Sequence, residues 1–422
     1  MKSSEELNAI NAKPEVQMHQ EASFSWNLLG LYALLICPFI IAYPQNSSIF
    51  YMLSRGMQLL CVTIWLTLQF YNNLRISLEN KIFVYSVHAW WIFLICNTFM
   101  QVPTRQFTLI YYWITIWNIL LIAKLYMTRD FVRHLYHVGI LFSFLVYLNV
   151  ILYVLFPEGL WVDTEWLGNG DKTRYLFGNY NQTGIVGLIA LLIWGAYTFL
   201  TGRGFKNMFW LMVCNLGVVA IMGSMTSTVG ILIICLYFLL HKRIKHPFRW
   251  VSIFFTVYIL FFVIIVWQGK NLQEWPLLTD FVVNVLHKNI TFTHRTYLWF
   301  SSVKLIMDSP IIGYGARDVE WMIKAIGGSG PHNIWLLMLL EGGLVSFTLL
   351  VNMFVAIFRS LRKRHDVAGS YVAVCISVLL LMSLFETYNT ICFFFILIIA
   401  YYMRYAKKEQ EEIPTLNDTA NE

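Results

Sequence analysis

The chain has 422 residues, of which 58% are hydrophobic, 17% aromatic and only 13% charged. This composition excludes an ordinary soluble globular domain and indicates a protein that crosses a membrane several times. The net charge of +7 follows largely from where Lys and Arg fall between the apolar stretches, so it gives little support to nucleic-acid binding.

The first 24 residues are polar and mixed in charge, and they lack the basic start and short apolar core of a cleavable signal peptide. A transmembrane helix needs about 20 apolar residues. Nine stretches that could supply one precede the largest polar segment, at 26–43, 49–70, 81–100, 107–127, 136–157, 182–200, 207–223, 225–241 and 250–268. Three more follow it, at 333–357, 369–385 and 387–404.

These stretches predict an all-α fold, a polytopic membrane protein with about 12 transmembrane helices in a single membrane domain over 26–404. The tails 1–25 and 405–422 lie outside that domain. Loops rich in Lys and Arg stay cytoplasmic, and here they alternate with loops that have neither residue, as around 386. Both termini are therefore predicted to be cytoplasmic, and the polar segment 269–332 is predicted to be a large outer loop.

Two outer segments break the pattern of short loops, at 158–181 and 269–332. The second contains a helix-like stretch, 295–307, which ends at a Ser-Pro turn. Its apolar spacing predicts a helix that lies on the membrane surface or covers a cavity. The apolar face of this helix is predicted to consist of Tyr297, Phe300, Val303 and Ile306.

Three polar residues of the second segment could carry chemistry. Arg295 could hold a phosphate bidentately, or it could be an arginine solvated in the loop. His332, where the tenth span begins, could take a proton from a hydroxyl group, or it could be an interfacial polar residue. Asn333 could orient that ring or bind sugar hydroxyls, or it could cap the following helix.

Five further candidates lie elsewhere. Arg174, followed by Asn179 and Asn181, suits recognition of sugars and phosphate, although the asparagines could also be turn and cap residues. Arg55 falls inside the second span, where an arginine is costly unless it faces a cavity or a partner. Alternatively that span starts later and Arg55 reaches outward. Arg317 is an outer cation that could be an ordinary loop charge.

The sequence offers no signal for a bound cofactor or metal. It contains no Walker loop, dinucleotide fingerprint or zinc motif, and all seven cysteines fall inside predicted spans. Nothing repeats between the two halves of the chain, which counts against a transporter built from duplicated halves. The candidate charges also gather at the outer surface rather than near the bilayer midplane, which favours an enzyme over a transporter.

With these residues in this order, the chain resembles the family of O-antigen polymerases and O-antigen ligases, with its capsule and exopolysaccharide polymerase relatives. The main element covers about 50 residues and consists of Arg295, Trp299, Pro310, Gly313, Gly315, His332, Asn333, Glu341, Gly342 and Gly343. A second element consists of Arg174, Gly178, Asn179 and Asn181.

The resemblance implies a glycosyltransferase of the bacterial plasma membrane that works on the outer face without metal or nucleotide sugar. Its donor would be a glycan on undecaprenyl pyrophosphate. Arg295 would hold the pyrophosphate, His332 would activate the acceptor hydroxyl or assist at the phosphate, and Glu341 would join the substrate-binding residues. Because pyrophosphate is a good leaving group, positive charge and one base meet the main demands of the reaction. In-line attack predicts inversion at the anomeric carbon.

The chain departs from the family pattern at one position. Members often carry an arginine after Ser or Thr and before Gly at the start of a span, whereas here Val229 precedes Gly230. A second phosphate-binding arginine would then come from Arg55, Arg174 or Arg317, or be absent. This departure fits the sequence-divergent polymerases that extend repeat units.

The sequence therefore predicts a polymerase of lipid-linked oligosaccharide repeat units. A ligase that passes a finished glycan to another acceptor is the alternative with the same chemistry. A lipid-linked oligosaccharide flippase or transporter is the alternative from another class. The predicted partners are the undecaprenyl-pyrophosphate-linked oligosaccharide and membrane lipids, with a chain-length regulator and a flippase as further candidates.

Overall fold

The computed structural model describes residues 26–41, 82–102, 106–128, 130–163, 172–244, 246–267, 295–388 and 390–406, and a few residues between 56 and 67. These residues are almost entirely helical. The exception is one antiparallel pair of three-residue strands, β1 (Trp161–Asp163) and β2 (Lys172–Arg174). The predicted all-α fold is therefore correct apart from this small strand pair in the segment 158–181.

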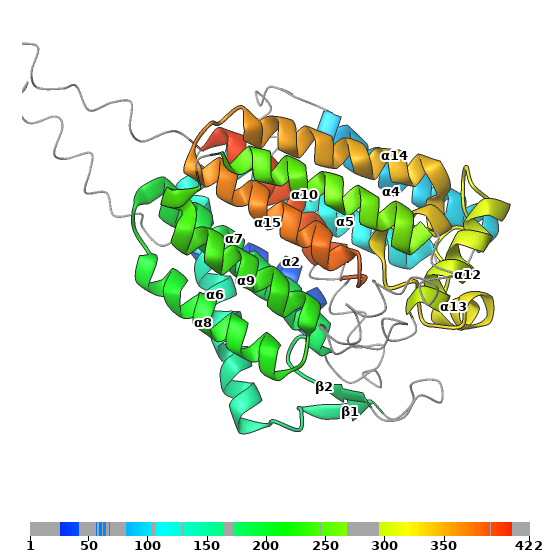
Figure 1. Ribbon diagram of the computed structural model, residues 1–422, viewed down its shortest axis with the longest axis horizontal. Helices are drawn as coiled ribbons and strands as arrows, with labels where there is room; N and C mark the ends of the chain where they lie inside the picture. The colour runs from blue at the N-terminus through cyan, green and yellow to red at the C-terminus, as the bar shows by residue number, and fades with distance from the viewer. Residues whose placement is uncertain are drawn as a thin grey trace, which may run out of the picture.

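The long helices form a bundle in which neighbouring helices run side by side (Figure 1). They are α2 (Trp26–Ile40), α4 (Ile82–Gln101), α5 (Gln106–Ile122), α6 (Phe131–Leu155), α7 (Tyr180–Thr201), α8 (Phe205–Ile221), α9 (Met225–Leu240), α10 (Pro247–Phe261), α14 (Ile334–Arg362), α15 (Val367–Ser383) and α16 (Thr390–Tyr402). Two further helices, α12 (Arg295–Asp308) and α13 (Val319–Ile326), lie at one end of the bundle. Short π-helical or 3₁₀ turns extend the bundle helices at η1 (Ala123–Met127), η2 (His241–Arg243), η3 (Phe262–Trp267) and η6 (Met403–Tyr405).

Seven helices of the described residues are long and apolar enough to cross a membrane: Ile82–Gln101, Thr108–Met127, Phe131–Leu155, Tyr180–Thr201, Met225–Arg243, Pro247–Ile264 and Ile334–Arg362. Four shorter apolar helices accompany them: Leu29–Pro38, Phe205–Ile221, Val367–Ser383 and Thr390–Tyr405. Each falls on a predicted span. The second predicted span, 49–70, lies mostly outside the described residues. The count of twelve spans and the side that each loop faces stay predictions.

The loop that follows α12 forms backbone hydrogen bonds with α14 at a point where the helix is broken. Gly343 leaves the helical conformation, with φ 56° and ψ −155°. At this break Leu344 N donates to Pro310 O and Tyr314 N donates to Leu340 O, both at 2.8 Å. A Cβ atom on Gly343 would lie 2.2 Å from Ile311 O, so only glycine fits.

Side chains of helix α4 form further hydrogen bonds with the same loop. Asn97 Nδ2 donates to Ile312 O at 2.7 Å, and Gln101 Nε2 donates to Gly313 O at 3.1 Å. Thr98 Oγ1 accepts from Ala316 N at 2.8 Å. Residues that carry the family resemblance, among them Gly313 and Gly343, therefore help to hold α12 against the start of α14.

The buried face of α12 differs from the predicted one. Tyr297 is 63% exposed and Phe300 is 37% exposed, so neither forms the core-facing side. Ile306 is buried as predicted, but the other buried residues are Leu298, Trp299 and Ser302. Trp299, the largest of them, is completely buried, and its Nε1 donates to Pro331 O at 3.0 Å. Because burial of the indole contributes most to packing here, it sets the rotation of the helix.

Candidate functional site

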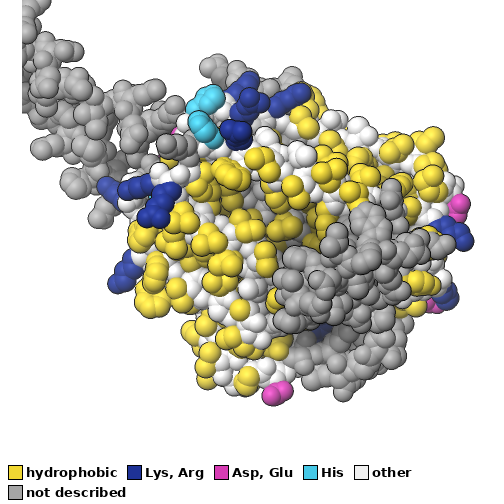
Figure 2. Space-filling model, in the orientation of Figure 1, with side chains coloured by type: hydrophobic (Ala, Val, Ile, Leu, Met, Phe, Trp, Pro, Cys, Tyr) yellow, Lys and Arg dark blue, Asp and Glu magenta, His cyan; other side chains and the backbone are white. Residues whose placement is uncertain are grey.

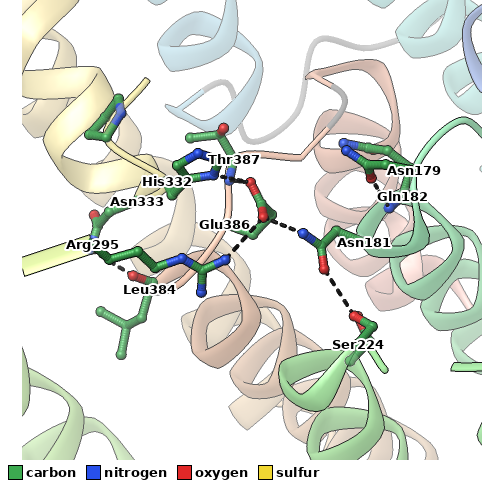
Figure 3. A network of polar contacts seen from close by, with 12 residues as sticks. Asn179, Asn181, Gln182, Ser224, Arg295, His332, Asn333, Leu384, Glu386 and Thr387 are labelled. Atoms are coloured by element: carbon green, nitrogen blue, oxygen red, sulfur yellow. Dashed lines mark hydrogen bonds and ion pairs between the residues drawn. The ribbon is translucent and has the colours of Figure 1, made fainter. Parts of the chain in front are cut away.

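A polar cluster forms where several helices begin, and Glu386 lies at its centre (Figure 3). Glu386 comes from the turn between α15 and α16 and is only 6% exposed. Its Oε1 atom lies 2.7 Å from His332 Nδ1 and accepts from Thr387 N at 3.1 Å. Its Oε2 atom accepts from Asn181 Nδ2 and lies 3.4 Å from Arg295 Nη2. The carboxylate thus links the two predicted catalytic residues.

The elements that supply these residues meet at one end of the bundle. Arg295 is the first residue of α12, and Asn181 lies in the first turn of α7. His332 comes just before α14, while Ser224 is the N-cap residue of α9 and donates to Asn181 Oδ1 at 3.0 Å. Because a helix N-terminus carries unpaired N–H groups and partial positive charge, this convergence favours an anion.

His332 is held in one orientation. A carboxylate can only accept hydrogen bonds, so Nδ1 of His332 donates to Glu386 and Nε2 of the neutral ring is left as the acceptor. The side chain is 32% exposed, which lets a hydroxyl group reach Nε2. The residue also has a positive φ of 47°, a backbone conformation that few non-glycine residues adopt, although histidine adopts it more often than most. Such backbone strain is often found at functional sites.

Arg295 uses little of its hydrogen-bonding capacity on the other described residues. A guanidinium group has five N–H donors, and one contact, to Glu386 at 3.4 Å, joins it to the other described residues. The side chain is 22% exposed. The remaining donors can therefore bind the oxygens of a phosphate group without breaking a contact with another described residue.

Asn333 and Asn179 occupy positions at helix N-termini. Asn333 is fully buried, its Oδ1 accepts from the N–H groups of Trp335 and Leu336, and its Nδ2 donates to Leu384 O at 3.0 Å. Asn179 Oδ1 accepts from Gln182 N at 3.0 Å and caps α7. For both residues the capping alternative describes the observed contacts. A direct role of either amide in binding stays untested.

Arg174, Arg317 and Glu341 have no described contact with Glu386. Arg174 is half-buried in β2, where its backbone O accepts from Leu160 N at 2.8 Å. Arg317 Nε donates to Tyr314 O at 2.8 Å, and its guanidinium lies 5.1 Å from the centre of the Trp321 ring. Glu341 is half-buried, and its backbone O accepts from Gly315 N at 2.8 Å. Arg55 lies outside the described residues.

Glu386 was missed by the sequence reasoning. A single acidic residue in the apolar region 369–404 was the available signal, because an ionisable residue within or beside a span is a functional candidate. Nearby Tyr388 is also buried.

The bundle of apolar helices defines an integral membrane protein. At one end of the bundle a buried carboxylate joins a partly exposed arginine and a partly exposed histidine, and this site is suited to an anionic substrate. Residues 207–351 match a family model described as O-antigen ligase. The match confirms the resemblance to the family of O-antigen polymerases and ligases, whose members are glycosyltransferase-like membrane enzymes. No curated protein matches the chain.

The matched residues include Arg295, His332, Asn333 and Glu341, whereas Asn181 and Glu386 lie outside them. The site is therefore assembled from the matched region together with residues from α7 and from the turn before α16. Val229, the position without the expected arginine, is 46% exposed on α9. Among the described residues in contact with Glu386, Arg295 supplies the permanent positive charge.

Proposed function

We propose that the protein is a glycosyltransferase that polymerises undecaprenyl-pyrophosphate-linked oligosaccharide repeat units on the outer face of the membrane. The observation that carries the proposal is the arrangement of Arg295, Glu386 and His332, in which one carboxylate contacts both the phosphate-binding candidate and the base candidate. The family match supports the reaction class. No step of the proposed reaction requires a metal or a cofactor.

In the proposed reaction His332 Nε2 accepts the proton of the acceptor hydroxyl while that oxygen attacks the anomeric carbon of the donor glycan. The bond from this carbon to the pyrophosphate oxygen breaks, and the lipid pyrophosphate leaves with the electron pair. Arg295 and the surrounding helix N-termini stabilise the negative charge of the leaving group. Glu386 stabilises the imidazolium that forms, and one displacement inverts the anomeric carbon.

A ligase is the second candidate, because the matching family model carries that description. It would use the same donor and the same site residues, and only the acceptor would differ. The missing arginine at Val229 supports the polymerase. A flippase is less well supported, since the polar cluster lies at the end of the bundle rather than near its middle.

The test is to complement a deletion strain with wild-type protein or with His332→Ala and to compare the sizes of surface glycan and of lipid-linked intermediates. The control is His246→Ala, an exposed histidine just before α10, away from the cluster. Both variants must reach the membrane in normal amounts. Loss of long polymer with single repeat units still at the surface would support the polymerase. Long chains left on the lipid carrier would indicate a ligase, and unchanged glycan would refute both.

A further inference from the structure

A long groove lies between α10 and α14, away from the Glu386 cluster. Its cavity volume is about 980 Å³, and its walls include Phe255, Ile259 and Phe354. The helix that forms one wall packs weakly, because only 11% of the span Pro247–Ile264 is buried inside the protein. Hydrophobic side chains cover much of the visible surface of the bundle in this region (Figure 2). The groove therefore opens toward the hydrocarbon of the membrane.

The uncharged polar groups that line the groove are already paired. Tyr258 OH and Trp335 Nε1 form a hydrogen bond with each other. Ser252 Oγ donates to Phe248 O at 3.0 Å. Along most of its length the groove thus offers apolar surface, and its occupant there should be hydrocarbon, since an unpaired polar group would lose its bonds to water.

One end of the groove is strongly basic. Arg249, in the first turn of α10, and Arg359 and Arg362, in the last turn of α14, all line it. The three side chains are exposed, and none has a hydrogen bond or ion pair with another residue that the structure describes. No Asp or Glu of the described residues lines the groove. Arg364 nearby is different, because Asp366 pairs with it.

We propose that this groove binds an anionic phospholipid, with the head-group phosphate among Arg249, Arg359 and Arg362 and the acyl chains between α10 and α14. Guanidinium groups match the oxygens of a phosphate, and the apolar walls match acyl chains. From Arg249 to Val263 the wall is about 21 Å long, more than half of the hydrocarbon core. The basic end is predicted to be cytoplasmic, where pockets between spans bind anionic head groups.

The occupant is distinct from the lipid-linked donor. The three arginines lie where α14 ends, whereas His332 lies just before α14 begins and shares Glu386 with Arg295. The part of α14 that follows its break at Gly343, which ends at Arg362, alone spans about 28 Å, and the turns before the break lie beyond it. A donor whose pyrophosphate is bound at Arg295 leaves the arginines at the other end without an anion. We therefore expect the groove to bind a second lipid, with its head group at the opposite end of the bundle from the pyrophosphate of the donor.

The experiment counts lipids on the purified protein by native mass spectrometry in nonionic detergent. The probes are phosphatidylglycerol and phosphatidylcholine with the same acyl chains. We expect preferential binding of phosphatidylglycerol. Because each arginine contributes about fivefold near an anionic head group, Arg359→Gln with Arg362→Gln should weaken binding about 25-fold. Ile259→Trp, at a wall residue that is 58% exposed, should also reduce binding by filling the groove while the arginines remain.

The matched control is Arg203→Gln with Lys206→Gln, a pair of exposed cations predicted to face the same side that does not line the groove. This control should bind phosphatidylglycerol as the wild type does. Equal binding of the two phospholipids, or an equal loss in the control, would overturn the proposal. Displacement of phosphatidylglycerol by a polyprenyl phosphate would assign the groove to the donor instead and would also overturn it. None of these readouts depends on transferase activity.

Discussion

Replacement of Glu386 by Gln tests whether the buried carboxylate controls His332. The substitution keeps the size of the side chain but removes the charge that both His332 and Arg295 contact. A hydrogen bond to a charged group contributes about 1.5–3 kcal/mol. If that contribution is made to the imidazolium in the transition state, the rate should fall about 10- to 150-fold.

The two rate parameters should respond differently. Glu386 contacts the base and not the acceptor, so kcat should fall while KM for the acceptor changes little. Arg295 keeps its charge in the variant and can still bind the pyrophosphate. Glu386→Asp retains the negative charge and should recover part of the lost rate. The assay follows elongation of a purified lipid-linked repeat unit by protein in nanodiscs, with single-turnover rates measured for each variant.

The control is Glu320→Gln, which removes an exposed carboxylate of α13 whose partner is Lys324 at 2.7 Å. This variant should keep the wild-type rate, because an exposed ion pair contributes little to stability. If Glu386→Gln folds normally and its kcat stays within about twofold of wild type, Glu386 does not position the base, and the proposed division of roles is wrong.

Three further outcomes are expected. Arg295→Gln should lower kcat/KM about 100- to 1,000-fold, because stabilisation of the leaving pyrophosphate is lost, and steady-state kinetics with varied donor measures it. Asn333→Ala should lower Tm through the loss of about 1–2 kcal/mol of helix capping at α14, as followed by thermal unfolding in detergent. Gly343→Ala should destabilise the protein by at least about 2 kcal/mol, because its Cβ would meet Ile311 O at 2.2 Å. Gly217→Ala, with no atom within 4 Å of its Cβ, is the matched control and should be neutral or slightly stabilising.

The positions of the apolar helices could be predicted because hydrophobic stretches of sufficient length have few alternatives to crossing a membrane. The rotation of α12 could not. The spacing of its apolar residues is compatible with two different buried faces. The choice between these faces depends on the packing of Trp299 against the residues before His332. Tertiary contacts of this kind leave no periodic signal in the sequence.

The candidate site was predictable in part. Arg295, His332 and Asn181 were recognised by residue type and position, and they lie in one cluster. Glu386 was not recognised, because it is separated from His332 by 54 positions and only the path of α14, α15 and the following turn brings the two together. For Asn179 and Asn333, one residue type suited both sugar binding and capping, and only the observed contacts distinguish these alternatives.

The hydrogen bonds of Glu386 also bear on which residue of the cluster would act as the base in the proposed reaction. A carboxylate offers about four acceptor sites, and here four groups occupy them: Thr387 N, His332 Nδ1, Asn181 Nδ2 and Arg295 Nη2. A substrate hydroxyl would have to displace one of these donors to reach the carboxylate, which is itself buried. His332 instead presents Nε2 from a partly exposed ring. The geometry therefore favours His332 as the group that receives the proton and Glu386 as the group that positions it.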